Sequence, residues 1–250
     1  MKKVIIIFLV IFIFIFSVDV MAGINEFYLS SDKIDTKIKY YEIDSKKPGP
    51  TAVITAGIHG DEPAGHFAAL KLKDYKLMKG KMYIFPAINN YGLNNNTRYY
   101  LDEIDLNRSF PGEIENNRGE VLAHLLFDFI SKKADIVIDL HESEHFAREN
   151  NNYYGQSIIA GTNDESIRYG MNVVSKINEE IRKSKYKFIL NSYPVQNSLI
   201  WSSDKILGIP SFMVETCKEM KLEERINYQL RITKYLLIEA GVDIDEYKGN

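Results

Sequence analysis

Short apolar runs rich in β-branched residues alternate along the chain with longer amphipathic stretches. The apolar runs predict strands over 27–31, 34–43, 82–88, 134–140, 188–190 and 211–216, with a further strand that begins at Thr51. The amphipathic stretches predict helices over 64–73, 115–132, 166–184 and 219–239, the first with Phe67, Leu70 and Leu72 facing inward. Because strands alternate with helices, we expect an α/β fold whose sheet is covered by helices on both faces.

The strand that begins at Thr51 leads into the short segment His59–Pro63. Its glycines allow the backbone to turn sharply, and its final proline suits the first turn of a helix. His59 and Glu62 are therefore expected on a tight loop between the end of a strand and the start of a helix. An imidazole nitrogen and a carboxylate oxygen are common zinc ligands, and a catalytic zinc site needs only one further protein ligand and water.

Two more ionisable side chains stand at the ends of predicted strands. His141 follows the strand 134–140, and Glu215 lies near the end of the strand 211–216. In open α/β sheets the ligand site lies in the crevice at the strand ends, so we expect both residues to meet the loop that carries His59. Taken singly, a lone histidine is more often structural than a ligand, and a strand-end glutamate is usually solvated.

The polar stretch 89–112 shows little periodicity. A loop of that length in a compact domain is usually either disordered or functional, and the presence of Arg98, Asn107 and Arg108 favours function. Arg98 is a candidate for stabilising an oxyanion, while Asn107 and Arg108 are candidates for binding a substrate carboxylate. The alternative is that Arg108 is an ordinary loop arginine paired with Asp102 or Asp105.

These residues predict one metal ion held by His59, Glu62 and His141. Such an ion would polarise a carbonyl and lower the pKa of bound water to about 7. Glu215 would act as the general base, which takes a proton from that water and passes it to the leaving nitrogen. Asp139 either orients the imidazole of His141 through its second nitrogen or caps a loop as a strand-end carboxylate.

The segment His141–His145 also matches H-E-x-x-H, the pattern of helical zinc proteases. That chemistry requires a helix that places both histidines on one face. The preceding residues form a strand-type run, and the segment soon reaches three consecutive asparagines, so we expect only His141 of the five to be a ligand. Glu142 and Glu144 are then expected to be loop residues near the site.

Net charge and cysteine content exclude or disfavour some classes of protein. The formal net charge of the 250 residues is −3 and basic residues are scattered, which gives no indication of a nucleic-acid partner. The single cysteine, Cys217, excludes an intramolecular disulfide and a thiolate metal cluster. It is expected to pack as a small apolar residue, although its position two residues after Glu215 could also bring it near the site.

The N-terminus carries two lysines followed by an apolar run and then small residues. This pattern predicts a cleaved signal peptide over 1–22 and a catalytic domain over 23–250, in a protein exported to the periplasm or the extracellular space. The alternative is that the segment is retained as a membrane anchor, and nothing else in the sequence indicates contact with a membrane. The apolar run is somewhat short for a membrane span, which needs about 20 apolar residues. The oligomeric state stays open.

Five motifs together resemble the zinc carboxypeptidase superfamily. They are His59–Gly65, Arg98, Asp105–Gly112, Asp139–His141 and Val214–Glu215, and they come closest to the branch of succinylglutamate desuccinylases, aspartoacylases and murein peptide amidases. The resemblance implies a mixed, mostly parallel sheet of about eight strands flanked by helices. It implies one zinc ion on His59, Glu62 and His141, with Glu215 as base. It also implies that the loop arginines and Asn107 bind the oxyanion and the carboxylate.

The chain departs from this family in ways that bear on substrate. Many carboxypeptidases use a tyrosine near the substrate terminus, and here Tyr153, Tyr154 and Tyr193 are candidates that no motif distinguishes. The export signal and the short segment after Glu215 favour a peptidase or amidase acting on short or peptidoglycan-derived peptides. The alternatives are a deacylase of N-acyl amino acids and a domain that binds wall peptides without cleaving them.

Overall fold

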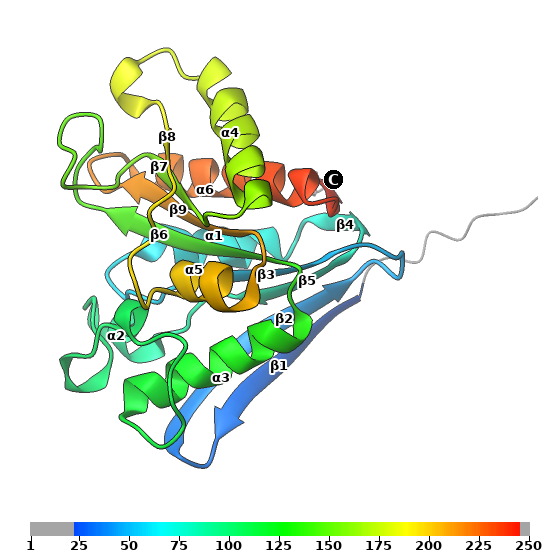
Figure 1. Cartoon of the computed structure of the whole chain (residues 1–250), viewed down its shortest axis with the longest axis vertical. Coiled ribbons are helices and arrows are strands. Elements are labelled where there is room, and N and C mark those ends of the chain that lie inside the picture. The colour runs from blue at the N-terminus through cyan, green and yellow to red at the C-terminus, as the bar shows by residue number, and fades with distance from the viewer. Residues whose placement is uncertain (1–22, 246–250) are drawn as a thin grey trace, which may run out of the picture.

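The computed structural model describes residues 23–245 as a layered α/β fold, so the predicted signal segment 1–22 lies outside the described residues (Figure 1). The main sheet has eight strands in the order β1-β2-β5-β3-β6-β9-β7-β8. Its strands are β1 (Gly23–Ser31), β2 (Ile34–Asp44), β3 (Thr51–Ala56), β5 (Lys81–Phe85), β6 (Ile136–Ser143), β7 (Ser157–Ala160), β8 (Ile189–Asn191) and β9 (Ser211–Cys217). A second sheet pairs β4 (Lys76–Lys79) with β10 (Asp243–Asp245).

The centre of the main sheet is parallel and its flanks are partly antiparallel. Strands β5, β3, β6 and β9 run parallel to one another, whereas β1 with β2, β2 with β5, and β9 with β7 are antiparallel pairs. The expectation of a mixed, mostly parallel sheet of about eight strands is confirmed. The parallel centre aligns the carboxyl ends of β3, β6 and β9 along one edge, which is where ligand sites of such sheets lie.

Helices cover both faces of this sheet, as the sequence pattern predicts. They are α1 (Pro63–Leu72), α2 (Asn90–Asn95), α3 (Arg118–Lys133), α4 (Asp164–Glu179), α5 (Leu199–Ser202) and α6 (Leu222–Glu239), with short 3₁₀ turns over 101–103, 106–108 and 184–186 and a π turn over 203–207. Helices α1, α4 and α6 pack against one face, and α3 and α5 pack against the other (Figure 1). Among the described residues, no helix is both long enough and apolar enough to cross a membrane.

Alternation along the central strands decides which side chains reach each helical layer. In β6, Ile136, Ile138 and Leu140 belong to the core under α1, α4 and α6, whereas Val137 belongs to the core under α3 and α5. Successive side chains of a strand point to opposite faces. Asp139 and His141 therefore share the face of Val137, and Glu142 projects to the face covered by α1 and α6.

Two expectations about local structure are wrong. Phe67 of α1 is 41% exposed rather than inward, because the helix approaches the sheet through Ala64, Gly65, Ala68 and Ala69. A Cβ on Gly65 would lie 2.7 Å from the carbonyl oxygen of Leu140, so the close approach leaves no room for a large side chain. Glu142 is not a loop residue, because β6 continues to Ser143 and buries it.

Candidate active site

The loop between β3 and α1 presents His59 and Glu62 at the carboxyl edge of the sheet. The loop can pass close to α2 only because residue 60 is glycine: a Cβ there would lie 1.9 Å from the carbonyl carbon of Gly92. Asn89 secures this contact, since its Oδ1 accepts a hydrogen bond from the Gly92 N–H at 2.7 Å and its Nδ2 donates to Ile58 at 3.3 Å. The contacts with α2 and Asn89 therefore hold the backbone of the loop that carries His59 and Glu62.

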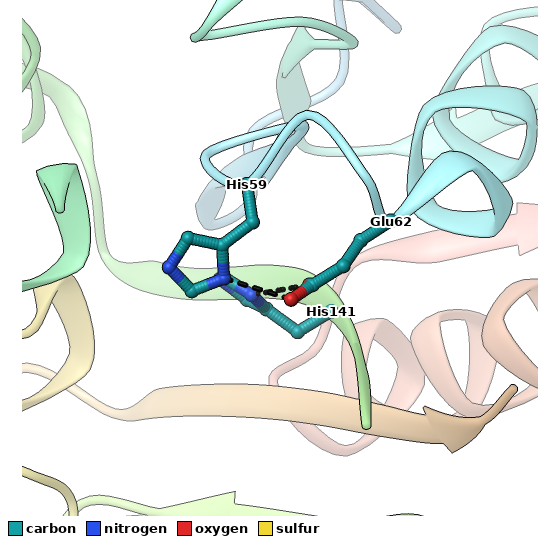
Figure 2. Close-up of side chains that lie close together, drawn as sticks. All are labelled: His59, Glu62 and His141. Atoms are coloured by element: carbon teal, nitrogen blue, oxygen red, sulfur yellow. Dashed lines mark hydrogen bonds and ion pairs between the residues drawn. The ribbon is translucent and has the colours of Figure 1, made fainter. Parts of the chain in front are cut away.

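His59, Glu62 and His141 converge on one another (Figure 2). One ligand-type atom from each lies within 4.8 Å of the others, and the two imidazole ring centres are 4.7 Å apart. The Nδ1 atoms of His59 and His141 lie 2.8 Å from Oε1 and Oε2 of Glu62, respectively. All three side chains are buried. The structure thus brings together the three residues that the sequence assigns to the metal.

The chemistry of these contacts fits a cation. The far nitrogen of each ring faces a carboxylate: Nε2 of His141 lies 2.8 Å from Asp139, and Nε2 of His59 lies 3.1 Å from Asp105. Metal-bound histidines usually donate that second N–H to such a partner, which leaves the other nitrogen as a lone pair. In that tautomer both Nδ1 lone pairs face the oxygens of Glu62, so a positive charge between them is needed to remove the repulsion.

Without a metal, protons supply that charge. Burial opposes a charged imidazolium, but the carboxylates of Glu62 and Asp105 outweigh burial and raise the pKa of His59. For His141 the carboxylates of Asp139 and Glu62 likewise overcome burial and raise its pKa well above the usual range. The pKa of Glu62 falls well below its usual range, because the two imidazoles outweigh burial. A divalent ion would displace these protons, since ligand nitrogens must be deprotonated.

Glu215 lies beside the metal-type cluster on the neighbouring strand. It pairs in register with His141 across β6 and β9, and its side chain lies in a cleft of about 350 Å³ that His59 and Glu62 also line. Its Oε2 is buried and has no hydrogen-bond partner among the described residues. Burial and the charge of Glu62 raise the pKa of Glu215 to about 7, and this shift is only partly offset by His141, His59 and Arg98. A carboxyl group with that pKa can both accept and return a proton near neutral pH.

The polar stretch after β5 contributes the opposite wall of the cleft. Arg98 lies 3.1 Å from Asp105 and 3.5 Å from Glu62, so its guanidinium points toward the cluster. Asn107 is buried, with Nδ2 3.5 Å from Nε2 of His141 and Oδ1 accepting a hydrogen bond from the Leu199 N–H at 3.0 Å. The structure therefore places both residues beside the cluster.

Arg108 also lines the cleft, and its Nη1 donates to the carbonyl oxygen of Asn107 at 2.7 Å. Among the described residues Arg108 forms no ion pair with Asp102 or Asp105, although its charge is one of the causes that lower the pKa of Asp105. Its guanidinium keeps other donors for an incoming anion, because an arginine carries five N–H groups.

The alternative zinc motif is excluded by the strand. His141 lies within β6, whereas His145 lies beyond it, is 53% exposed at its side chain and contacts Glu219 at 2.9 Å. Cys217 is buried against Phe146 and Met220 and does not line the cleft, which confirms the packing interpretation. Of the three tyrosines, Tyr153 and Tyr154 line the cleft, while Tyr193 is 82% exposed and does not.

Two residues of the site carry roles that the sequence motifs did not assign. Asp105 contacts His59 and Arg98 and also accepts a hydrogen bond from the Asn107 N–H at 2.9 Å, so one carboxylate joins three site residues. Lys218 lines the cleft, with its Nζ 3.0 Å from Asp61 and 2.7 Å from Glu144. The position of Asp105 at the start of the D-L-N-R segment was a usable signal, whereas nothing in the sequence marks Lys218.

The fold and the cluster together define an α/β protein with a two-histidine, one-glutamate site at the carboxyl edge of a mixed sheet. Comparison with known proteins shows which family this class of protein resembles. Residues 48–148 match the family model of the succinylglutamate desuccinylase/aspartoacylase catalytic domain. This match, together with the fold, confirms the resemblance to that branch of the zinc carboxypeptidase superfamily. The matched segment contains every site residue predicted from the sequence except Glu215.

Individual proteins show the same resemblance over parts of their length. An N-alpha-acetyl-L-2,4-diaminobutyric acid deacetylase from Halomonas elongata is 35% identical over 97 residues, which cover 37% of this chain and 28% of the relative. A tripeptide-bound structure of the cell shape determinant Csd4 from Helicobacter pylori superposes with a TM-score of 0.75 at 20% identity, covering 85% of this chain and 57% of Csd4. A succinylglutamate desuccinylase/aspartoacylase from Rhodobacter sphaeroides gives a TM-score of 0.64 at 21% identity, covering 90% of this chain and 67% of that one. The matched regions thus span about a quarter of the deacetylase and about two thirds or less of the solved structures.

Proposed function

We propose that this protein is an exported, zinc-dependent hydrolase that cleaves an amide bond next to a free carboxylate. The observation that carries the proposal is the convergence of His59, Glu62 and His141 within 4.8 Å, beside a buried glutamate whose Oε2 has no partner among the described residues. Two imidazoles and a carboxylate form the ligand set of several catalytic zinc sites. Export stands on the sequence of residues 1–22 alone.

The residues around the cluster supply the remaining chemistry. Zinc bound there would act as a Lewis acid toward the scissile carbonyl and lower the pKa of water. Glu215 would take a proton from the attacking water and deliver it to the leaving nitrogen. Arg98 would stabilise the oxyanion, and Asn107 with Arg108 would bind the substrate carboxylate. Each of these side chains lines the same cleft.

The size and charge of the cleft support a short peptide as substrate. A volume of about 350 Å³ accommodates a group larger than a single small acyl chain. Acidic residues also line the cleft and pair with Arg98 and Lys218, so Arg108, which forms no ion pair among the described residues, is the cation best placed for a substrate carboxylate. Csd4, whose fold this chain shares, is described as a D,L-carboxypeptidase in its mDAP-bound form. Peptidoglycan-derived peptides are therefore the first substrate class to examine.

A deacylase of N-acyl amino acids is the second candidate. The relative from Halomonas elongata is a deacetylase, and its 35% identity over 97 residues exceeds the 21% identity to mDAP-bound Csd4. The same carboxylate-binding residues would then hold the amino-acid head group. A domain that binds wall peptides without cleaving them is less favoured, because each residue to which the proposal gives a role in hydrolysis belongs to the cluster or lines the cleft.

A direct comparison of substrates tests the proposal. Purified protein lacking residues 1–22 is loaded with zinc, its metal content is measured, and it is incubated with muropeptides and separately with N-acetyl-diaminobutyrate and N-succinyl-glutamate. Mass spectrometry should show release of a terminal amino acid from a muropeptide. Turnover of the N-acyl amino acids alone would replace the peptidase with the deacylase, and a zinc-loaded protein without turnover on either panel would refute the hydrolase.

A further inference from the structure

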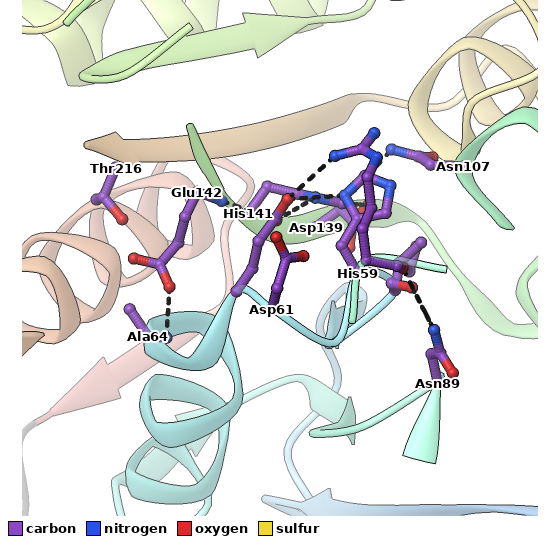
Figure 3. A network of polar contacts seen from close by, with 12 residues as sticks. His59, Asp61, Ala64, Asn89, Asn107, Asp139, His141, Glu142 and Thr216 are labelled. Atoms are coloured by element: carbon purple, nitrogen blue, oxygen red, sulfur yellow. Dashed lines mark hydrogen bonds and ion pairs between the residues drawn. The ribbon is translucent and has the colours of Figure 1, made fainter. Parts of the chain in front are cut away.

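Glu142 holds a buried position that the proposed reaction does not use. The residue is 4% exposed, and its fully buried side chain projects to the face of the sheet opposite that of His141. There its Oε2 accepts a hydrogen bond from the backbone N–H of Ala64 at 2.8 Å (Figure 3). Its Oε1 accepts a hydrogen bond from Arg225 of α6. The carboxylate therefore joins β6 to the first turn of α1 and to α6.

The contact with Ala64 replaces a missing helix cap. Glu62 occupies the N-cap position of α1, yet its side chain makes no capping hydrogen bond, because its oxygens face His59 and His141. The first N–H groups of a helix have no partner within the helix, and the N-terminus favours a negative charge. Glu142 supplies that acceptor and that charge from a neighbouring strand.

Glu142 also contacts Glu62 directly. Its backbone N–H donates to Oε2 of Glu62 at 2.9 Å, and this is the oxygen that faces His141. We propose that Glu142 is a positioning residue: it caps α1 from β6, so that Glu62 is free to hold the metal in a fixed orientation. The inference rests on the proposed metal site and adds the residue that sets the position of one ligand.

The contact between Glu142 and Ala64 can be removed without leaving an unpaired buried charge if Arg225 is replaced together with Glu142. The side chains of Glu142 and Arg225 are 0% and 12% exposed, so removing one partner would strand the other. Replacing a buried ion pair with apolar residues of similar volume is often neutral or stabilising. The double variant Glu142→Met/Arg225→Met should therefore keep the fold while removing the acceptor for the Ala64 N–H.

Asp204 offers a matched control. It is a buried carboxylate that accepts backbone N–H groups of Thr162 at 2.9 Å and Asn163 at 3.2 Å just before α4, and it lies 3.3 Å from Lys205. It does not line the cleft. Asp204→Ala should lower thermal stability by removing a comparable buried acceptor of backbone N–H groups and should leave the zinc affinity unchanged.

The experiment measures zinc affinity by competition with a chromogenic chelator, and thermal unfolding of the metal-free proteins. The double variant keeps the backbone N–H that contacts Glu62 and removes only the cap of α1, so we expect zinc binding to weaken about 10-fold, the lower end of the effect of losing an outer partner of a metal ligand. A folded double variant that binds zinc as tightly as the wild type would overturn this inference and leave the proposed function standing. The same holds if Asp204→Ala weakens zinc binding as much as the double variant does. A wild-type protein that binds no zinc would instead overturn the proposed function.

Discussion

Replacing Glu215 with Gln should slow hydrolysis and stabilise the metal-free protein at the same time. Gln keeps the shape of the side chain but cannot accept a proton, and a positioned general base typically contributes a rate factor of about 10² to 10⁴. The residue is buried and its Oε2 has no partner among the described residues, so the charge is held at a cost to folding. One substitution therefore tests both the chemistry and the electrostatics of the site.

The stability effect follows from the pKa. Burial and Glu62 raise the pKa of Glu215 from 4.5 to about 7, so the folded state disfavours the charged form. The penalty is absent below pH 4.5, grows as pH rises and is complete above pH 7. At about 1.4 kcal/mol per unit the ceiling is roughly 3 kcal/mol. Because Gln carries no charge, the metal-free variant should gain about 1–3 kcal/mol at high pH and little near the unfolded-state pKa.

Urea unfolding of metal-free protein at pH 5 and pH 8, together with turnover and zinc content of the loaded protein, checks both effects. Glu113→Gln, on an exposed residue whose side chain does not line the cleft, serves as the control and should change neither. Full turnover in Glu215→Gln would refute the role of base. A variant that is less stable than the wild type at pH 8 would refute the electrostatic reasoning, even if activity is lost.

Three further outcomes are expected. His141→Ala should abolish zinc binding, measured by elemental analysis, because it removes one of three converging ligands. Burial raises the pKa of the Cys217 thiol to about 11, so folded protein at pH 8 should react with iodoacetamide far more slowly than urea-unfolded protein, and equal rates would contradict its burial. Partial burial tends to raise the pKa of Asp44, but the Lys46 N–H and Lys81 lower it to about 2. Asp44→Asn should therefore cost about 1 kcal/mol at pH 7, a difference that disappears as pH falls from 4 toward 2 in urea titrations.

The sequence predicts the buried strands well because a strand covered on both faces is apolar along its whole length. The central strands β3, β6 and β9 are almost entirely buried, and polar site residues interrupt the apolar pattern mainly toward the carboxyl ends of β6 and β9. The short strands β7 and β10 do not stand out, since four and three residues are too few to show a period. Strand order is not readable either, because a hydrophobic pattern reports which face is buried and not which strand is the neighbour.

The inward face of α1 shows how packing overrides hydrophobicity. Phe67 is the largest apolar residue of the helix, and a pattern argument turns it toward the core. The helix instead meets the sheet through glycine and alanine, because its first turn must bring Glu62 close to β6. Proximity of backbones selects small residues at the contact and leaves Phe67 on the outer side of the helix.

Some site residues can be predicted from the sequence and others cannot. His59, Glu62, His141 and Glu215 are readable because each follows or ends an apolar strand, and strand ends of a parallel sheet share one edge. The sequence pattern does not predict that Lys218 lies at the cleft, because the contact that holds it there is with Asp61, which lies 157 positions away in the sequence.

The pair His141–Glu142 shows why the conformation of a motif decides its chemistry. On a helix, the same two letters would form part of a zinc-protease signature, with the glutamate serving as base. On a strand, consecutive side chains point to opposite faces, so the imidazole of His141 meets Glu62 while the carboxylate of Glu142 enters the layer between β6, α1 and α6. The base must then come from elsewhere, and the register of β6 with β9 brings Glu215 opposite His141. The strand thus explains both why Glu142 is free to cap α1 and why a distant glutamate faces the metal-type cluster.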